Sequence, residues 1–335
     1  MFRRRPPEDA PERDLLARAD AWLRASPGRA LTGDAVRAIA QQEGIDFATA
    51  LCYQAVCRDP RQETFLRTLA ALPETMTPDC RLDATVAVVP GAFYREYPHT
   101  GADGRLLREV AAEFACPTEL IPLPSFRSPR AAARLIVDWL ARRPNGERIV
   151  LVSLSKGGGE VKLALAEPDA EHAFRNVNTW VNLCGLLHGT PLANWAVARR
   201  LRALWFRLVL WMQGHDFTIV HELARGPGTP LDGALRLPAH LQLISVVGFP
   251  LRRHLTNGLA RRCHRRLSPL GPNDGAGVLL SDVAEMPGLV YPFWGADHYL
   301  KPANINVHGL VVRILHYLCR AQEPAHVEQG ANEPA

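Results

Sequence analysis

The sequence predicts an α/β fold in which a mostly parallel sheet is covered by helices on both faces. Short apolar, β-rich runs alternate with helical stretches from about residue 84 onward. One of these runs leads directly into a serine-glycine turn and then a further helical stretch. The chain of 335 residues is long enough for one such domain with an additional segment.

The pattern of the N-terminal part of the chain predicts helices and no strands. Residues 1–13 combine Pro, Arg and acidic residues without periodicity and are expected to be a disordered tail. Between residues 14 and 80, apolar residues recur at a spacing of three to four, which predicts a helical segment. Thr32 or Asp34, and Asp46, are typical N-cap residues for its helices.

Residues 81–322 are expected to form the main domain, and residues 323–335 a second disordered tail. Apolar runs predict strands at 85–90, 118–124, 148–153, 178–185 and 241–248, with a last short strand before residue 298. Amphipathic stretches predict helices at 103–114, 128–143, 158–167 and 305–320.

A stretch at about 189–237 interrupts this alternation and is interpreted as a helical lid insertion. On a helix, one face would carry Val197, Leu201, Leu204, Trp205, Leu208 and Met212, while Arg199, Arg202 and Arg207 would point away. Three interpretations stay open: a helix packed on the sheet, a mobile cap over a site for apolar substrates, or a helix lying on a membrane surface.

Composition excludes several classes of protein. The net charge of +5 comes almost entirely from arginine, and no basic-aromatic module of a nucleic-acid binder is present. No apolar run is long enough for a membrane span, and the N-terminus lacks the apolar core of a secretory signal. The seven cysteines are scattered and odd in number, which predicts reduced thiols, no disulfide framework and a cytoplasmic location. No metal or cofactor is expected.

The stretch "VLVSLSKGGGEV" (150–161) runs from a predicted strand into a helix and carries Ser155 between them. A nucleophile elbow requires small residues two positions before and after its serine, and these are Ser153 and Gly157. Since position 153 is usually glycine, the motif alone fits a plain glycine-rich turn equally well.

A candidate acid and base follow Ser155 in the order typical of hydrolases with a parallel sheet. Asp274 lies in "SPLGPNDGAGVLLSD", and His298 lies in "YPFWGADHYLKP" after the last predicted strand. A neutral imidazole would take the serine proton, and a carboxylate would orient the imidazole. Asp282 and Asp297 are alternative acids.

The chain from about 84 to 322 resembles the α/β-hydrolase superfamily, specifically its bacterial lipase/esterase-like branch. The similar stretches are "GPNDGAGVLLSD" (271–282), "LCGLLHGTPLANW" (183–195), "VVPGAFY" (88–94) and "LSKGG" (154–158). The chain departs from the family pattern at Ser153 and at Pro90, where histidine is commoner.

The resemblance implies a serine hydrolase that cleaves esters with a hydrophobic acyl group through an acyl-enzyme. It places the oxyanion hole at the backbone N–H groups of Ala92 and Lys156. Expected substrate contacts are Phe93 beside it, His188 near the start of the lid insertion and Trp205 on the apolar face of the lid helix. A structural role for His188 stays open.

The implied partner is a small-molecule or lipid ester. An acyltransferase or thioesterase whose N-terminal helices contact a carrier protein stays open, as do a peripheral membrane contact and a noncatalytic binding protein.

Overall fold

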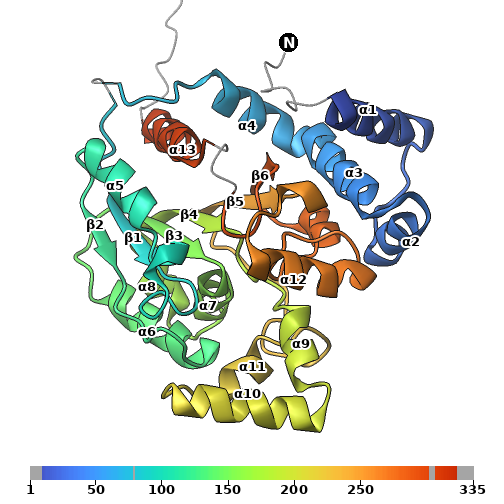
Figure 1. Ribbon diagram of the computed structural model, residues 1–335. Helices are drawn as coiled ribbons and strands as arrows, with labels where there is room; N and C mark the ends of the chain where they lie inside the picture. Colours follow the sequence, from blue (N-terminus) through green and yellow to red (C-terminus); the bar gives the residue numbers. More distant parts are fainter. Residues whose placement is uncertain (1–9, 78–79, 302–305, 323–335) are drawn as a thin grey trace, which may run out of the picture.

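The computed structural model describes residues 10–77, 80–301 and 306–322 (Figure 1). Within these residues a six-stranded sheet has the order β2-β1-β3-β4-β5-β6, and every neighbouring pair is parallel. The strands are β1 (Thr85–Val89), β2 (Thr118–Leu120), β3 (Ile149–Leu154), β4 (Val177–Leu183), β5 (Gln242–Phe249) and β6 (Leu289–Trp294). The predicted α/β class with a parallel sheet is therefore confirmed.

Helices cover both faces of the sheet, because alternate side chains of its buried strands are apolar on each side. On one face Val86 and Val150 pack against α5 (Arg105–Glu113) and α13 (Val307–Gln322). On the other face Ala87 and Leu151 pack against α6 (Pro129–Ala141) and α7 (Lys156–Ala164). The carboxyl ends of the strands, where ligands bind in such sheets, are thereby left for loops to cover.

Four helices precede the sheet: α1 (Ala10–Ala25), α2 (Gly33–Glu43), α3 (Ile45–Arg58) and α4 (Pro60–Ala71). Phe47 and Leu51 of α3 share a buried apolar cluster with Val247 and Phe249 of β5. The N-terminal helices thus complete the core of the main domain instead of forming a unit apart from it.

Helix α1 begins at Ala10, so the expectation of disorder up to residue 13 is wrong for residues 10–13. Glu12 explains the difference, because its buried carboxylate accepts a hydrogen bond from Trp294 Nε1 at 2.8 Å and pairs with Arg253 and His254. Composition alone does not reveal such distant partners. The rest of that predicted tail, 1–9, and the C-terminal tail, 323–335, lie outside the described residues.

The predicted N-caps are partly right. The Thr32 side chain accepts a hydrogen bond from Ala35 N–H at 3.3 Å and caps α2. Asp46, however, lies in the first turn of α3, whose N-cap is Gly44. The Asp46 carboxylate instead accepts the N–H of Arg252 at 3.0 Å, a partner 206 residues away.

The insertion between β4 and β5 carries three helices, which lie at one end of the molecule (Figure 1). They are α9 (Pro191–Val197), α10 (Arg200–Met212) and α11 (Thr218–Glu222). The predicted apolar face of α10 is not packed on the sheet, because its large side chains are 51% to 84% exposed. The interpretation of α10 as a helix packed on the sheet is therefore wrong: its buried residue is Leu210, on the opposite side.

The remaining helices are short. They are α8 (Ala170–Ala173), α12 (Gly258–Leu267), η1 (Pro98–Thr100), η2 (Phe174–Asn176), η3 (Arg252–His254), η4 (Ser268–Leu270) and η5 (Leu280–Glu285). No helix within the described ranges is long and apolar enough to cross a membrane.

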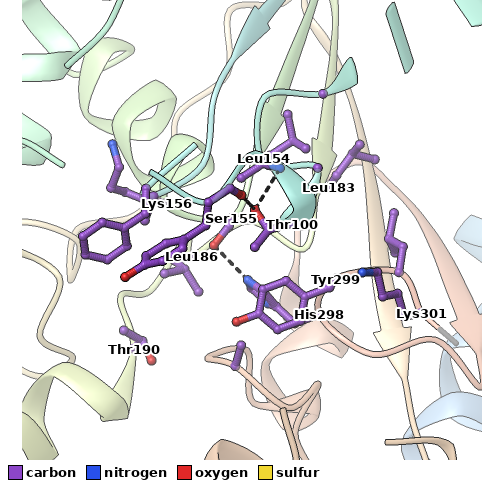
Figure 2. Close-up of a pocket in the computed structure, with 18 of the residues that line it drawn as sticks. Thr100, Leu154, Ser155, Lys156, Leu183, Leu186, Thr190, His298, Tyr299 and Lys301 are labelled. Carbon is purple, nitrogen blue, oxygen red and sulfur yellow. Dashed lines mark hydrogen bonds between the residues drawn. The ribbon is translucent and has the colours of Figure 1, made fainter. Parts of the chain in front are cut away.

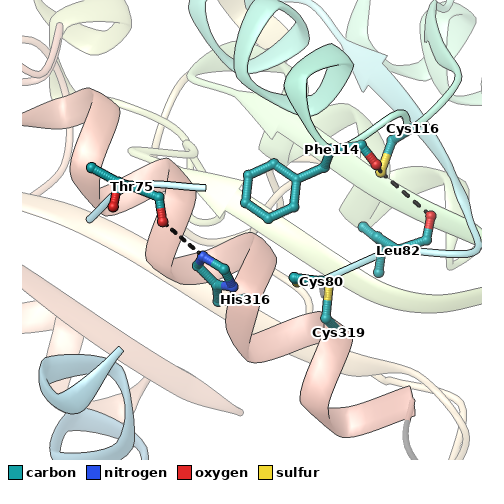
Figure 3. The surroundings of a disulfide bond; sticks show 7 residues. All are labelled: Thr75, Cys80, Leu82, Phe114, Cys116, His316 and Cys319. Atoms are coloured by element: carbon teal, nitrogen blue, oxygen red, sulfur yellow. Dashed lines mark hydrogen bonds between the residues drawn. A yellow bond between two sulfur atoms is a disulfide. The ribbon is translucent and has the colours of Figure 1, made fainter. Parts of the chain in front are cut away.

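A disulfide joins Cys80 to Cys319, which contradicts the expectation of reduced thiols (Figure 3). The two residues are 239 positions apart in sequence, but folding lays the segment before β1 against α13 and brings their Cα atoms to 6.2 Å. His316, one turn earlier on α13, bonds the carbonyl of Thr75 at 3.0 Å and holds the same two segments together. The cysteines therefore no longer support the prediction of a reducing compartment.

Candidate active site

The glycine-rich turn is a strained elbow between β3 and α7. Ser155 has φ 51° and ψ −115°, a backbone conformation that costs energy for any residue other than glycine. A Cβ at Gly157 would lie 2.8 Å from the carbonyl oxygen of Val89, and a Cβ at Gly158 would lie 2.7 Å from the Cα of Gly185. The glycines let α7 approach the neighbouring strands this closely, which fixes Ser155 at the top of the sheet.

Ser153 replaces the usual glycine of the elbow without loss of packing. It is fully buried, and its hydroxyl donates to Asn182 Oδ1 at 3.0 Å while accepting from Trp180 Nε1 at 2.7 Å. A buried hydroxyl with two partners carries little desolvation cost. The departure from the motif is thus accommodated by hydrogen bonds behind the elbow.

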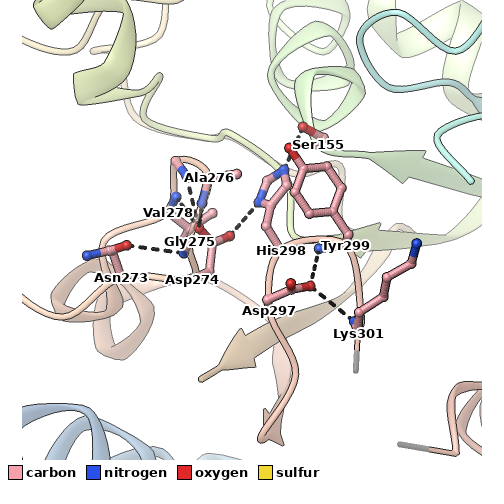
Figure 4. A network of polar contacts seen from close by, with 11 residues as sticks. Ser155, Asn273, Asp274, Gly275, Ala276, Val278, Asp297, His298, Tyr299 and Lys301 are labelled. Atoms are coloured by element: carbon pink, nitrogen blue, oxygen red, sulfur yellow. Dashed lines mark hydrogen bonds and ion pairs between the residues drawn. The ribbon is translucent and has the colours of Figure 1, made fainter. Parts of the chain in front are cut away.

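The structure brings together the three side chains that the sequence singled out (Figure 4), and Figure 2 shows Ser155 and His298 at the cavity. His298 Nε2 lies 2.8 Å from Ser155 Oγ, and His298 Nδ1 lies 2.5 Å from Asp274 Oδ2. The chain of contacts thus runs from hydroxyl through imidazole to carboxylate. This is the geometry in which an imidazole can take the proton of a serine hydroxyl.

Asp274 is held by its own turn. Its Oδ1 accepts the backbone N–H groups of Ala276, Gly277 and Val278 at 2.9 to 3.0 Å, which leaves Oδ2 for the histidine (Figure 4). Complete burial raises the pKa of this carboxyl, but the charge of His298 and these hydrogen bonds outweigh burial, so the net pKa is lowered. Asp274 is therefore a carboxylate at neutral pH.

His298 follows β6, and its backbone N–H donates to the carbonyl of Asp274 at 2.7 Å. Burial lowers the pKa of the imidazole, yet the charge and hydrogen bond of Asp274 outweigh burial and raise the net pKa above 6.5. A histidine with a raised pKa is a stronger base than usual in its neutral form.

The two alternative acids have other partners. Asp282 forms an ion pair with Arg225. Asp297 uses Oδ1 to accept the N–H groups of Tyr299 at 2.9 Å and Lys301 at 3.1 Å, which shapes the loop that carries His298 (Figure 4). Asp274 is thus the carboxylate that the structure places on the imidazole.

Both backbone groups predicted for the oxyanion hole lie at the cavity. Ala92 and Lys156 line it beside Ser155. Lys156 is the first residue of α7, where helix geometry leaves the N–H without an intrahelical acceptor. Among the backbone hydrogen bonds outside the helices and strands of the described chain, none has the N–H of Ala92 or Lys156 as its donor. The N–H of Phe93, the residue after Ala92, donates to the carbonyl of Ser125 at 3.2 Å. The Lys156 ammonium is buried and paired with Glu160.

A cavity of about 840 Å³ opens at Ser155 and His298. Its walls are mostly apolar and include Phe93 beside the elbow, Phe206 and Leu210 on α10, and strand and helix residues below Ser155. The lower group includes Val86, Val150, Val152, Val181, Leu310, Ile314 and Leu318. The volume suits a ligand of many non-hydrogen atoms with a long apolar part.

Two of the three predicted substrate contacts do not lie among the residues that line this cavity. Phe93 lines it, as expected. Trp205 is 57% exposed on the outer face of α10. The next residue, Phe206, faces the cavity in its place, because successive side chains of a helix point about 100° apart. His188 is half-buried near Asp282, where burial lowers its pKa.

The comparisons with known proteins agree with this architecture. The structure is similar to that of a metagenomic carboxyl esterase, with a TM-score of 0.50 and 19% identity over 81% of this chain and 90% of the esterase. It is also similar to the propeptide form of a Bacillus licheniformis lipase, with a TM-score of 0.52 and 19% identity over 79% of this chain and 56% of the lipase. No protein-family model and no curated protein sequence matches.

The chain has the α/β-hydrolase fold. Within the α/β-hydrolase fold the elbow after β3, the turn that carries Asp274 and the loop after β6 converge at one edge of the sheet. The sequence reasoning missed the cavity residues Trp195, Phe206 and Leu210. The spacing of Phe206 and Leu210, four positions apart, could have shown that α10 has a second apolar face.

Cys184, Asp274 and His298 are the candidate metal ligands among the described residues, with ligand atoms within 4.8 Å of one another. Burial raises the pKa of the Cys184 thiol well above 9, so the sulfur is protonated and a poor ligand. Asp274 and His298 already bond to each other. The cluster is therefore better explained as a hydrogen-bonded unit than as a metal centre.

Proposed function

We propose that this protein is a serine hydrolase that cleaves carboxylic esters with a hydrophobic acyl group. The observation that carries this proposal is the contact chain Ser155–His298–Asp274 at the edge of a large apolar cavity. A cavity with these walls favours an acyl chain over a small polar acid.

In the proposed reaction, His298 takes the proton of Ser155 as its Oγ attacks the ester carbonyl, and then delivers that proton to the departing alcohol. Asp274 keeps Nδ1 protonated and stabilises the imidazolium. The N–H groups of Ala92 and Lys156 stabilise the negative oxygen of the tetrahedral intermediate. Water, activated in the same way by His298, hydrolyses the acyl-enzyme.

A series of p-nitrophenyl esters from acetate to palmitate tests the proposal. We expect kcat/KM to rise with chain length by about tenfold or more, since each buried CH₂ contributes roughly 0.8 kcal/mol. A fluorophosphonate probe is expected to label Ser155. Failure of the probe to label this residue would contradict the serine mechanism, and a maximum at acetate would contradict the hydrophobic acyl group.

We further propose a peripheral membrane contact, which is supported by the outer face of α10. Its exposed apolar residues are Leu201, Leu204, Trp205, Leu208, Trp211 and Met212. At about 100° per residue, Arg200 and Arg207 border this stripe on one side and Arg202 borders it on the other. A helix with an apolar stripe between arginines is typical of helices that lie in the interface of an anionic membrane.

Charge favours an anionic lipid surface over a second copy of this chain as the partner of this face. A symmetric dimer brings the same patch of both copies together, so the arginines that border the stripe would face arginines. Anionic headgroups would instead neutralise these charges, while the leucines and tryptophans enter the acyl region.

Vesicle co-sedimentation tests the membrane contact. We expect the protein to bind phosphatidylglycerol vesicles, and the double variant Leu201→Ser/Trp211→Ser to bind about tenfold more weakly, since it loses apolar area. The matched control is Met76→Ser, which alters an exposed apolar residue outside α10. Equal binding by the double variant, or a dimer in solution that the double variant dissociates, would contradict the lipid contact.

A further inference from the structure

Trp195 of α9 lies between two guanidinium groups. The Cζ atom of Arg202 is 4.0 Å from the centroid of its ring, and that of Arg266 is 3.6 Å away. Two planar cations this close to one centroid would overlap on a single face, so they occupy opposite faces. Guanidinium groups commonly stack flat on an indole, and in that arrangement their N–H donors stay available for an acceptor.

This cluster has no ion-pair partner among the residues that the structure describes. In the described ranges, the carboxylates that form ion pairs do so with other cationic groups, not with Arg202, Arg266 or the neighbouring Arg199. The Nε of Arg202 is buried and has no hydrogen-bond partner. Guanidinium groups this close together repel one another, and a bound anion would offset that repulsion.

The same cluster forms part of the cavity of the proposed active site. Trp195 and Arg266 both line the cavity that contains Ser155. None of the described residues that line it is an aspartate or glutamate, whereas Arg266, Lys301 and Lys156 are cations, of which Lys156 is paired with Glu160. A cavity with apolar walls and cationic side chains concentrates positive electrostatic potential, which attracts an anionic group into it.

We propose that Arg266 binds a phosphate group on the alcohol part of the ester, so that the substrate class is an acylated alcohol phosphate. This inference rests on the proposed ester hydrolysis and names its substrate class. The apolar wall below Ser155 receives the acyl chain, and Arg266 on α12 receives the phosphate. The fork of N–H donors on arginine matches the oxygens of a phosphate, and such charge-assisted bonds are stronger than neutral ones.

Two esters that differ only by the phosphate give the test: 1-palmitoylglycerol 3-phosphate and 1-palmitoylglycerol. We expect the wild-type ratio of their kcat/KM values to favour the phosphate by about tenfold or more. Arg266→Ala should lower this ratio about tenfold, and Arg266→Lys should retain part of the preference because the charge remains. The matched control is Arg265→Ala on the same helix, outside the cavity lining, which should keep the wild-type ratio.

A binding measurement separates this inference from the hydrolase proposal. Dodecyl phosphate should bind the wild-type protein about tenfold more tightly than dodecanol, and Arg266→Ala should abolish the difference. If neither ester is hydrolysed but this preference holds, the hydrolase proposal fails and the phosphate site stands. Equal binding of the two ligands, or a preference that Arg266→Ala leaves intact, overturns the phosphate site. Inhibition by inorganic phosphate as strong as that by dodecyl phosphate would show a site for the free ion and would likewise overturn the proposed substrate.

Discussion

Replacing Ser155 by alanine is expected to lower kcat/KM for long-chain p-nitrophenyl esters by about 10⁴- to 10⁶-fold. The hydroxyl that lies 2.8 Å from His298 Nε2 would be the atom that forms the acyl-enzyme, and no other group can replace a lost nucleophile. The residual rate would come from the oxyanion donors and from binding alone. Steady-state hydrolysis and fluorophosphonate labelling of the same preparation provide the measurement.

Ser153→Ala is the matched control for this variant. It removes a hydroxyl two residues away that bonds Asn182 and Trp180 behind the elbow. We expect activity within a few-fold of wild type, and a loss of roughly 1–3 kcal/mol in the free energy of unfolding because Trp180 Nε1 would lose its acceptor. Full activity of Ser155→Ala with a normal melting temperature would exclude the mechanism proposed here.

Asp274→Asn is expected to lower kcat by about 10⁴-fold, since an amide favours the wrong tautomer of the imidazole. It should also move the acidic limb of the kcat/KM profile. His298 must be neutral to act as a base, and Asp274 raises its pKa, so activity in the wild type falls as the pH drops through that raised pKa. Without the negative charge the pKa decreases, and the limb should shift to lower pH.

Asp282→Asn provides the comparison, because it breaks the ion pair with Arg225 and leaves the imidazole contact intact. We expect its acidic limb to coincide with that of the wild type. A larger loss of kcat in Asp282→Asn than in Asp274→Asn, or an unshifted limb in the latter, would disprove the assignment of Asp274 as the acid.

Local pattern was sufficient for the class of fold, and it marked Ser155 as a candidate nucleophile without excluding a plain glycine-rich turn. The apolar run of β3, followed by Ser155 and three glycines, predicts a strand, a tight turn and a helix, because each step depends on neighbours within a few residues. The order of Ser155, Asp274 and His298 along the chain also limited the choice of base and acid.

Local pattern misled where a partner is distant in sequence. Residues 10–13 were expected to be disordered, yet Glu12 finds Trp294, Arg253 and His254 across the fold. The sequence left open whether the apolar face of α10 packs on the sheet, and the structure exposes it, because an apolar stripe reveals that a helix has a preferred side but not what lies against it.

What the sequence by itself determined about this protein is therefore its alternation of strands and helices and the elbow at Ser155. Only the tertiary structure decided which carboxylate contacts His298, that Cys80 reaches Cys319, and that Phe206 faces the cavity instead of Trp205. The physical reason is range: propensities and periodicity act over a few residues, whereas these contacts join segments 24 to 239 residues apart or depend on how a helix packs.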